Sequence, residues 1–463
     1  MKKLHIVGVV LAFALLAAAC GSSDDTTTTG AAAAATTTTA AAEGETTTTA
    51  SAEAGMKTGI GVDADTMTIR LGALHDLTGP VFSPLVVDIN DAMQIYYDNL
   101  NANGGIDGWM IEYIPEDTLY DVDTHLEKYE KLRDNVLAIT ASTGSPTSVA
   151  ALPALMEDNM TFIPLSWYSG WGIPEFDGGL ALEQNTNYCI EAMNILEFVN
   201  GMGGTTIALA TFPGDYGLDA AAGVKLAAEF YGIEIVYDGE GLVVPNGDNP
   251  EVIAGIAGSG ADWVFLTTNP TTSAILLGGA FGAGFTGLWT GSVPGYDFRL
   301  LDSPAAPLFD QVYYQSAYNV PWGSDAPGQV EMAEILKAVE PGKRPSDAFI
   351  IGWNEAKTMH SVLATAIANG DLTREGVQVA VSQTTSVDFA GTAPNQNYSG
   401  TPDEYVTRET AIFDPDLATY LAAGGAAQTI AQDDATTGSL LVQDFFVSEA
   451  AANFEFSAPC YEL

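Results

Sequence analysis

A short run of small hydroxylated residues offers the clearest binding chemistry in this sequence. Thr143, Ser145 and Thr147 straddle the expected start of a helix. The first turn of a helix has backbone N–H groups without intrahelical partners, and together with the helix dipole they favour a carboxylate or a carbonyl oxygen. Ser and Thr also cap helices without binding anything. The sequence therefore indicates either a ligand contact or an ordinary helix cap at this loop.

Aromatic side chains crowd into the next loop. Ser166 and Trp167 follow an expected strand over residues 160–165. Three large aromatic residues, Trp167, Tyr168 and Trp171, lie within the five residues 167–171. Because loops lie at the surface, these rings are candidates for stacking on an apolar or flat ligand. Packing between two parts of the fold is the alternative explanation, and the sequence does not decide between them.

Sequence motifs of catalysis are missing. The chain has no Gly-x-Ser-x-Gly, no His-Glu-x-x-His and no phosphate loop ending in Gly-Lys-Ser/Thr. Gly201, Gly203 and Gly204 precede an expected strand, whereas a dinucleotide fingerprint follows one. Four histidines and three cysteines in 463 residues leave no metal site rich in either. We therefore expect no enzyme, no cofactor and no metal.

Charge narrows the classes of partner. The 463 residues include 15 Lys and Arg against 59 Asp and Glu, a formal net charge of −44. Such a surface repels the phosphates of nucleic acids and anionic lipid headgroups. Hydrophobic residues make up 47% of the chain, which is enough for packed cores. We expect a folded acidic protein that binds no nucleic acid.

The first 65 residues read as an export signal followed by a tether. Lys2 and Lys3 precede an apolar run over residues 4–19, which is too short for a comfortable membrane span and ends at Cys20. Small residues before this cysteine resemble a bacterial lipobox, so we expect a signal peptide at 1–19, an acylated Cys20 and a Thr- and Ala-rich disordered tether at 20–65. Ordinary signal cleavage beside a chance cysteine is the alternative. The prediction places the protein outside the cytoplasm, attached to the cell membrane only through its lipid.

Strands and helices alternate along the folded body. The expected strands cover 67–74, 109–114, 136–140 and 160–165, and then 205–211, 233–237 and 263–268. Each series predicts a parallel sheet covered on both faces, and two series predict an α/β fold of two doubly wound lobes with a ligand crevice between them. The expected boundaries are 66–186 plus about 320–382 for lobe I, and 187–319 plus about 383–463 for lobe II.

Several short motifs follow one another in a recognisable order. They are Leu71-Gly72-Ala73-Leu74, Thr78-Gly79-Pro80, Asn103-Gly104-Gly105-Ile106-Asp107-Gly108, Ser142-Thr143-Gly144-Ser145-Pro146 and Gly214-Asp215-Tyr216-Gly217. This set, spread over residues 67–380, resembles the solute-binding proteins of ABC importers of the branched-chain amino acid or amide type, which have the type I periplasmic-binding fold. The resemblance implies a monomer whose two lobes, joined by a hinge, close on a small solute and deliver it to an ABC permease. A ligand-sensing module of the same fold is the main alternative, and an extracytoplasmic hydrolase is less favoured because no nucleophile–base pair is evident.

The resemblance also implies which side chains touch the ligand. Ser145 lies in the loop where the family has a contact, and Tyr216 lies where lobe II supplies one. Other candidates follow strands that end at the same crevice. The full set of expected ligand contacts is Thr143, Ser145, Thr147, Ser166, Trp167, Tyr216, Asn269 and Ser292.

One departure from the family pattern concerns the charge of the ligand. Family members that hold amino acids place an acidic residue after the strand that here spans 287–290, but this chain has no acid there before Asp297. An ammonium group buried without a partner carboxylate is very costly. We therefore expect an amide, a short carboxylate or another small polar solute to bind as well as an amino acid.

The two remaining cysteines form an even pair once Cys20 is acylated. Cys189 opens lobe II and Cys460 lies near the end of the chain, in a protein whose export permits oxidation. We expect a disulfide between them that fastens the C-terminal segment to lobe II. Two buried free thiols are the alternative.

Overall fold

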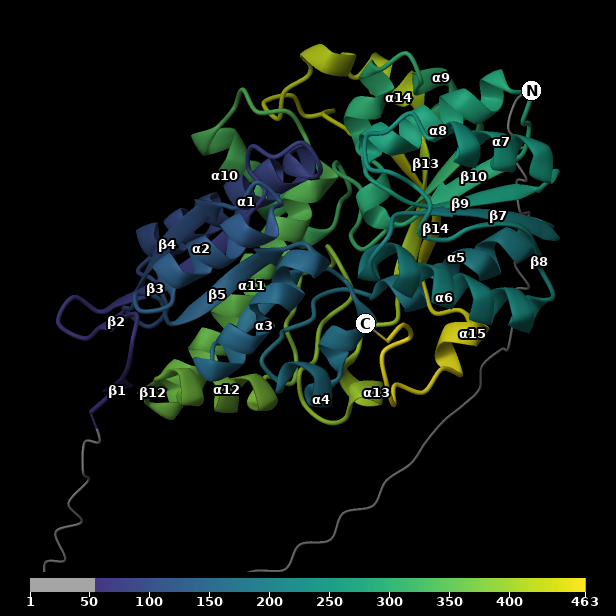
Figure 1. The fold of residues 1–463 in the computed structure, drawn as a ribbon. Coiled ribbons are helices and arrows are strands. Elements are labelled where there is room, and N and C mark those ends of the chain that lie inside the picture. The colour runs from purple at the N-terminus through teal and green to yellow at the C-terminus, as the bar shows by residue number, and fades with distance from the viewer. Residues whose placement is uncertain (1–54, 463) are drawn as a thin grey trace, which may run out of the picture. The chain divides into compact units, whose positions relative to one another are not determined.

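The computed structural model describes residues 55–462, which fold around two β-sheets (Figure 1). The sheet of lobe I has five strands: β2 (Val62–Asp63), β3 (Thr68–His75), β4 (Met110–Asp117), β5 (Ala138–Thr143) and β6 (Phe162–Leu165). Strands β4, β3, β5 and β6 lie in that order and run parallel, whereas β2 pairs antiparallel with the start of β3. Because the long strands are parallel, the loops after β3, β4, β5 and β6 leave the sheet at one edge.

Helices pack around this sheet. The long ones are α1 (Ser83–Ala102), α2 (Val122–Leu132), α3 (Ser145–Glu157), α10 (Pro327–Val339), α11 (Asp347–Asn369) and α12 (Arg374–Gln383). Helix α1 buries Val86, Ile89 and Met93, whose three- and four-residue spacing gives it an apolar face, and it packs against α11. A Cβ atom at Gly352 would lie 2.2 Å from the carbonyl oxygen of Ile89, so the close crossing of the two helices requires glycine there.

The sheet of lobe II has seven strands in the order β14-β13-β11-β10-β9-β7-β8. Their bounds are β7 (Thr206–Thr211), β8 (Glu234–Gly239), β9 (Trp263–Thr267), β10 (Leu288–Gly291), β11 (Tyr313–Ala317), β13 (Thr410–Pro415) and β14 (Ser439–Phe446). The five strands from β8 to β11 are parallel, but β13 is antiparallel to β11 and β14 is antiparallel to β13. The sheet is therefore mixed, because β13 and β14, from the segment after residue 384, add two antiparallel strands to the parallel series.

The helices of lobe II follow its strands along the chain. They are α5 (Tyr188–Gly201), α6 (Asp215–Tyr231), α7 (Pro250–Ser259), α8 (Pro270–Gly282), α9 (Ala306–Val312), α14 (Leu417–Ala422) and α15 (Glu449–Ala452). Shorter elements complete the two lobes: β1 (Lys57–Thr58), β12 (Asp371–Leu372), α4 (Pro174–Asp177), α13 (Pro402–Tyr405), and the 3-10 helices η1 (Ser169–Gly172), η2 (Val293–Gly295), η3 (Phe298–Asp302) and η4 (Gly425–Ala427).

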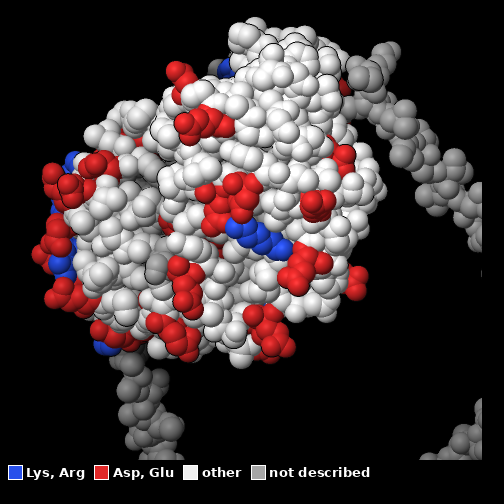
Figure 2. Space-filling view, turned by 45° about the vertical axis from the view of Figure 1, so that its right-hand side comes forward, with Lys and Arg blue, Asp and Glu red and all other residues white. Residues whose placement is uncertain are grey.

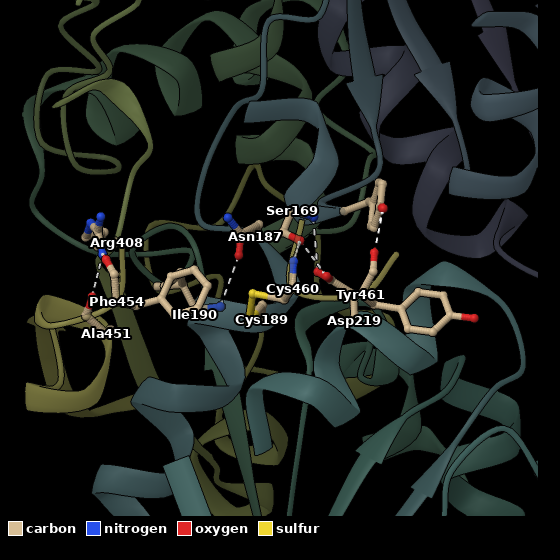
Figure 3. Close-up of a disulfide and its surroundings, with 11 residues drawn as sticks. Ser169, Asn187, Cys189, Ile190, Asp219, Arg408, Ala451, Phe454, Cys460 and Tyr461 are labelled. Atoms are coloured by element: carbon tan, nitrogen blue, oxygen red, sulfur yellow. Dashed lines mark hydrogen bonds between the residues drawn. A yellow bond between two sulfur atoms is a disulfide. The ribbon is translucent and has the colours of Figure 1, made fainter. Parts of the chain in front are cut away.

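The C-terminal segment is fastened where the two lobes meet. A disulfide joins Cys189, in the first turn of α5, to Cys460, with 6.3 Å between the Cα atoms (Figure 3). The backbone N–H of Cys460 donates to Ser169 Oγ at 2.8 Å, and Ser169 in turn donates to Asp219 Oδ1 of α6 at 2.5 Å. The end of the chain thus holds a loop of lobe I and two helices of lobe II together.

Charged side chains on the surface are mostly acidic. Figure 2 shows Asp and Glu dispersed over one face with few Lys or Arg between them. None of the helices within residues 55–462 has the length and apolar character needed to cross a membrane. The expected signal peptide, Cys20 and most of the expected tether lie outside the described residues.

Candidate ligand-binding site

A cavity of about 910 Å³, measured to its open mouth, lies between the two lobes. Lobe I contributes one face of α1 and the starts of α3 and α11, and lobe II contributes the segment 293–298 together with β11 and β13. Of the 26 lining residues five are Tyr or Trp and twelve are apolar: Phe82, Leu85, Val86, Ile89, Leu165, Val293, Pro294, Phe298, Ala317, Ala348, Ile351 and Phe413. An enclosed space with this lining is suited to hydrocarbon.

Aromatic rings from both lobes meet in the wall of this cavity. Phe82 of lobe I packs edge-on against Tyr216 of lobe II, with 6.4 Å between the ring centroids. Tyr216 also packs on Tyr188, at 4.6 Å, and Tyr188 packs on Trp167, at 6.1 Å. This chain of rings gives the cavity a continuous aromatic side.

Four of the expected contact residues line the cavity, namely Thr143, Ser145, Trp167 and Tyr216. The first two flank Gly144, which has a φ angle of +91° and precedes helix α3. A Cβ atom at position 144 would also lie 2.3 Å from the ring of Tyr120, another lining residue. Glycine therefore allows the sharp turn that brings the first turn of α3 to the cavity.

The other four expected contacts lie outside this lining. Thr147 donates to the carbonyl oxygen of Gly144, and Ser166 shares a hydrogen bond with Ser145. Asn269 caps α8 by accepting from the N–H of Thr272, and its side-chain amide also donates to the carbonyl oxygen of Val81 in lobe I. Ser292 donates to the carboxylate of Glu191 at 2.6 Å. Each of these polar side chains has a structural partner.

The aromatic loop after β6 divides between cavity and core. The ring of Trp167 faces the cavity, but Tyr168 and Trp171 are buried in the core of lobe I beside Phe162 and Phe176. A position in a loop does not prevent burial, because η1 folds this loop back onto the sheet. Stacking on a ligand in the cavity between the lobes therefore applies to Trp167 alone within this cluster.

Three polar groups in the lining lack a hydrogen bond of good geometry within the described chain. One, the hydroxyl of Ser316, lies close to the carboxyl group of Glu191. The other two are the indole N–H of Trp167, whose residue is 5% exposed, and the hydroxyl of Tyr296, whose residue is 7% exposed. Buried polar groups are normally paired, because leaving one unpaired costs about 1–3 kcal/mol. Both groups are donors that a ligand oxygen would satisfy.

The carboxylates in the lining already have partners. Asp297 forms an ion pair with Arg299 at 2.9 Å, and burial raises its pKa to about 6. Asp347 accepts hydrogen bonds from the backbone N–H of Trp322 and from the hydroxyls of Thr437 and Ser439. Its burial raises the pKa of its carboxyl group. The cavity thus offers no free carboxylate to an ammonium group, in line with the departure noted in the sequence.

Sequence reasoning did not identify most of this lining. Val86 and Ile89 read as an ordinary core face of a helix, because spacing alone does not distinguish a side chain that packs on protein from one that faces a cavity. Glu191 was also missed: it is fully buried at the start of lobe II, accepts hydrogen bonds from Ser292, Val293 and Tyr318, and has its pKa raised to about 7 by desolvation. The only feature of the sequence that could have drawn attention to Glu191 is that it is an acidic residue in a mostly apolar helix.

Metal binding receives no support from the arrangement of side chains. Across residues 55–462, no three His, Cys, Asp or Glu side chains come together as metal ligands would. His75 is buried and bonds to Thr143 and Tyr113, and desolvation lowers its pKa to about 3. His75 is therefore a neutral residue whose hydrogen bond to the Thr143 hydroxyl helps to fix that side chain.

Comparisons with known proteins agree on one family. A family model described as "Periplasmic binding protein" matches residues 68–416. The fatty acid ABC transporter substrate-binding protein from Thermomonospora curvata is 30% identical and has a TM-score of 0.75, with 86% of this chain and 97% of that chain covered. The branched-chain amino acid ABC transporter protein from Thermus thermophilus with bound valine is 17% identical, with a TM-score of 0.66 and coverage of 84% and 98%. No curated protein matches the sequence.

Proposed function

Because the chain belongs to the periplasmic binding protein family, we propose that it is the solute receptor of an ABC transporter and that its solute combines a long apolar part with one carboxylate or carbonyl head. The chain has the type I periplasmic-binding fold, and it is a binding protein and not an enzyme. The observation that carries the proposal is the apolar cavity between the lobes, in whose wall the Trp167 N–H and the Tyr296 hydroxyl have no hydrogen-bond partner among residues 55–462.

The apolar part of the ligand follows from the lining. Twelve apolar side chains from both lobes line this cavity. Each methylene group that leaves water for such a surface contributes about 0.8 kcal/mol. An extended hydrocarbon chain therefore gains more from this cavity than a small polar solute does. The relative from Thermomonospora curvata, which is named for fatty acids, supports the same class.

The head of the ligand follows from the donors. The N–H of Trp167 and the O–H of Tyr296 have no acceptor within residues 55–462. Ser145, the first residue of α3, lines the same cavity, and the first N–H groups of a helix have no intrahelical partner. A carboxylate satisfies such donors with charge-assisted hydrogen bonds. An ammonium group would meet only Asp297 and Asp347, which already have partners. The proposed ligand is therefore a fatty acid or a related apolar carboxylate, and not a branched-chain amino acid.

A chain-length series tests the proposal. Calorimetry of the purified mature protein should show affinity that rises from hexanoate to octanoate to decanoate, by about fourfold for each methylene group. Leucine and decylammonium should bind at least tenfold more weakly than decanoate. Binding of leucine that is tighter than binding of decanoate would contradict the proposal, and so would affinity independent of chain length.

Removal of one donor tests the position of the head. Trp167→Phe keeps a ring and deletes the N–H, so decanoate affinity should fall about tenfold while decanol affinity changes little, because a hydrogen bond to a charged group contributes about 1.5–3 kcal/mol. Trp109→Phe is the matched control, since Trp109 is buried in the core and does not line the cavity. An equal loss for decanoate and decanol would place the head elsewhere.

The anchor is a separate proposal. We propose that Cys20 is acylated and that the Thr-rich segment tethers the receptor to the membrane. Cys20→Ala should move the protein from the membrane fraction to the soluble fraction or block its maturation. Unchanged partitioning of this variant would contradict the anchor without bearing on the ligand.

A further inference from the structure

A second cavity of about 700 Å³, measured to its open mouth, lies beside α4, α12 and α13, away from the cavity between the lobes. It is enclosed by the segment 171–183, which contains α4, by α12, and by the segment 396–405, which ends in α13. Figure 1 shows α4, α12 and α13 beside one another, away from the sheet of lobe II. No residue lines both this cavity and the one between the lobes, so the two are separate spaces.

An acidic side chain without a normal partner lines this second cavity. Glu183 is 5% exposed, and neither of its carboxyl oxygens accepts a hydrogen bond of good geometry within the described chain. Burial raises its pKa well above the usual range, and the nearby carboxyls of Asp219 on α6 and Asp177 on α4 add to the rise. The side-chain amide of Asn187 acts weakly in the opposite direction. The site therefore favours any cation that could neutralise Glu183.

The remaining lining suits an organic cation. Trp171, Tyr398 and Tyr405 place three aromatic rings in the wall, and Tyr398 is only 9% exposed. Asp177 accepts from the N–H groups of Gly179 and Ala181, which fixes a second carboxyl in the wall. No Lys, Arg or His lines the cavity. Aromatic faces beside a carboxylate attract alkylammonium ions through their quadrupoles and the opposite charge.

We propose that this cavity binds a small organic ammonium ion, with its charge against Glu183 and its alkyl groups against the aromatic wall. A divalent metal is the less suitable occupant, because within residues 55–462 no three acidic, His or Cys side chains are placed so that they could hold a metal ion together. The proposal does not depend on the ligand between the lobes, since no residue is shared by the two cavities.

Binding should release a proton. At pH values below its raised pKa, Glu183 is protonated when the cavity holds no cation. The incoming ammonium ion forms an ion pair with the carboxylate, and the proton leaves to the buffer. Below the pKa of Glu183 in the unliganded protein, affinity should therefore rise about tenfold for each pH unit. Asp177 and Asp219 face Glu183, and their own raised pKa values of about 7 moderate this rise.

Calorimetry with choline tests the proposal, and 3,3-dimethyl-1-butanol serves as the neutral probe of the same shape. Choline should bind the mature protein at pH 8 at least tenfold more tightly than the alcohol, with proton release visible as heats that depend on the buffer. Glu183→Gln should abolish this preference, whereas Glu175→Gln, an exposed residue of α4, should retain it. Tyr405→Leu, which removes one aromatic wall, should weaken choline binding at least threefold.

Three results would overturn the proposal. They are no choline binding at millimolar concentration at pH 8, equal affinity for choline and the alcohol, and unchanged affinity in Glu183→Gln. If Glu183→Gln does not fold, Tyr405→Leu decides by the same criterion. Decanoate binding should be unaffected by Glu183→Gln, so failure of this site is distinguishable from failure of the cleft proposal.

Discussion

Arg299 of lobe II forms an ion pair with Asp88 on helix α1 of lobe I, so that one guanidinium group bridges the two lobes. The same group pairs with Asp297 at 2.9 Å and lies over the ring of Phe298, at 4.8 Å from its centroid. Arg344 of lobe I approaches the same ring, at 4.9 Å, and pairs with Asp302 of lobe II. Because Phe298 lines the cavity, these two ion pairs couple contact between the lobes to the ligand site.

Removal of this bridge should weaken ligand binding by opening the lobes. Arg299→Gln leaves the buried Asp88 unpaired on one side, and a partly exposed pair of this kind contributes about 1–2 kcal/mol to closure. Decanoate affinity should fall about five- to thirtyfold, and small-angle scattering should show a larger radius of gyration without ligand. Arg70→Gln is the control, because its pair with Glu112 lies within lobe I. Equal effects of both variants would contradict a role in closure.

Burial of carboxyl groups should make the protein less stable as the pH rises. Desolvation raises the pKa of Glu191, Asp177 and Asp219 to about 7, and that of Asp215 and Asp297 to about 6. In the unfolded chain these groups ionise near pH 4, so the folded state binds more protons between about pH 4 and 7. The stability that they contribute is present below pH 4 and is lost as the pH rises through 6–7.

Glu191→Gln should reduce this dependence. The free energy of unfolding, measured by denaturant titration at pH 5 and pH 8, should fall less steeply in the variant than in the wild type, because one group no longer titrates. The variant still has to accommodate Ser292 and Val293, so a constant loss at both pH values is compatible with the prediction. Glu197→Gln, further along α5, serves as the control. An unchanged slope in Glu191→Gln would contradict the assignment.

The parts of the fold that sequence predicted well are those with local signals. Strands such as β3 and β7 follow from short apolar runs, and they lie within one residue of the expected ranges 67–74 and 205–211. The segment after 384 gave no such signal, because β13 and β14 are separated by 23 residues and pair with strands far away in the sequence. Their antiparallel direction depends on that long-range pairing.

The cavity lining shows the same division. Thr143 and Ser145 could be predicted because they lie between a parallel strand and the helix that follows it. Such junctions all lie at the same edge of a parallel sheet, which is the edge where a ligand binds. The partners of Ser292 and Asn269 depended instead on contacts over tens to hundreds of residues, with Glu191 and with Val81. No local pattern in the sequence reports such contacts.

The disulfide between Cys189 and Cys460 should contribute substantially to stability. It closes a loop of 271 residues, and a cross-link of this kind typically stabilises by about 2–4 kcal/mol through the unfolded state. Cys460→Ser should lower the denaturant midpoint accordingly, and reductant should have the same effect on the wild type. The double variant Cys189→Ser with Cys460→Ser should not respond to reductant. Titration of two thiols in denatured, unreduced mature protein would contradict the bridge.

Filling the cavity should block ligand binding without unfolding the protein. Ala348 lies in the first turn of α11, is 6% exposed and lines the cavity, so Ala348→Phe places a ring in the space that the hydrocarbon chain would occupy. Extra atoms in a packed core cost about 1–3 kcal/mol, but here the ring has a cavity to enter, and the melting temperature should change by only a few degrees.

The measurement compares this variant with a change of the same size at an exposed site. Ala368→Phe lies on α11 and faces solvent, so it controls for the added ring and for the helix. Decanoate affinity should fall at least tenfold in Ala348→Phe and remain unchanged in Ala368→Phe, and hexanoate should lose less than decanoate because a shorter chain needs less of the cavity. Full retention of decanoate binding by a folded Ala348→Phe would show that the apolar part of the ligand lies elsewhere in the protein.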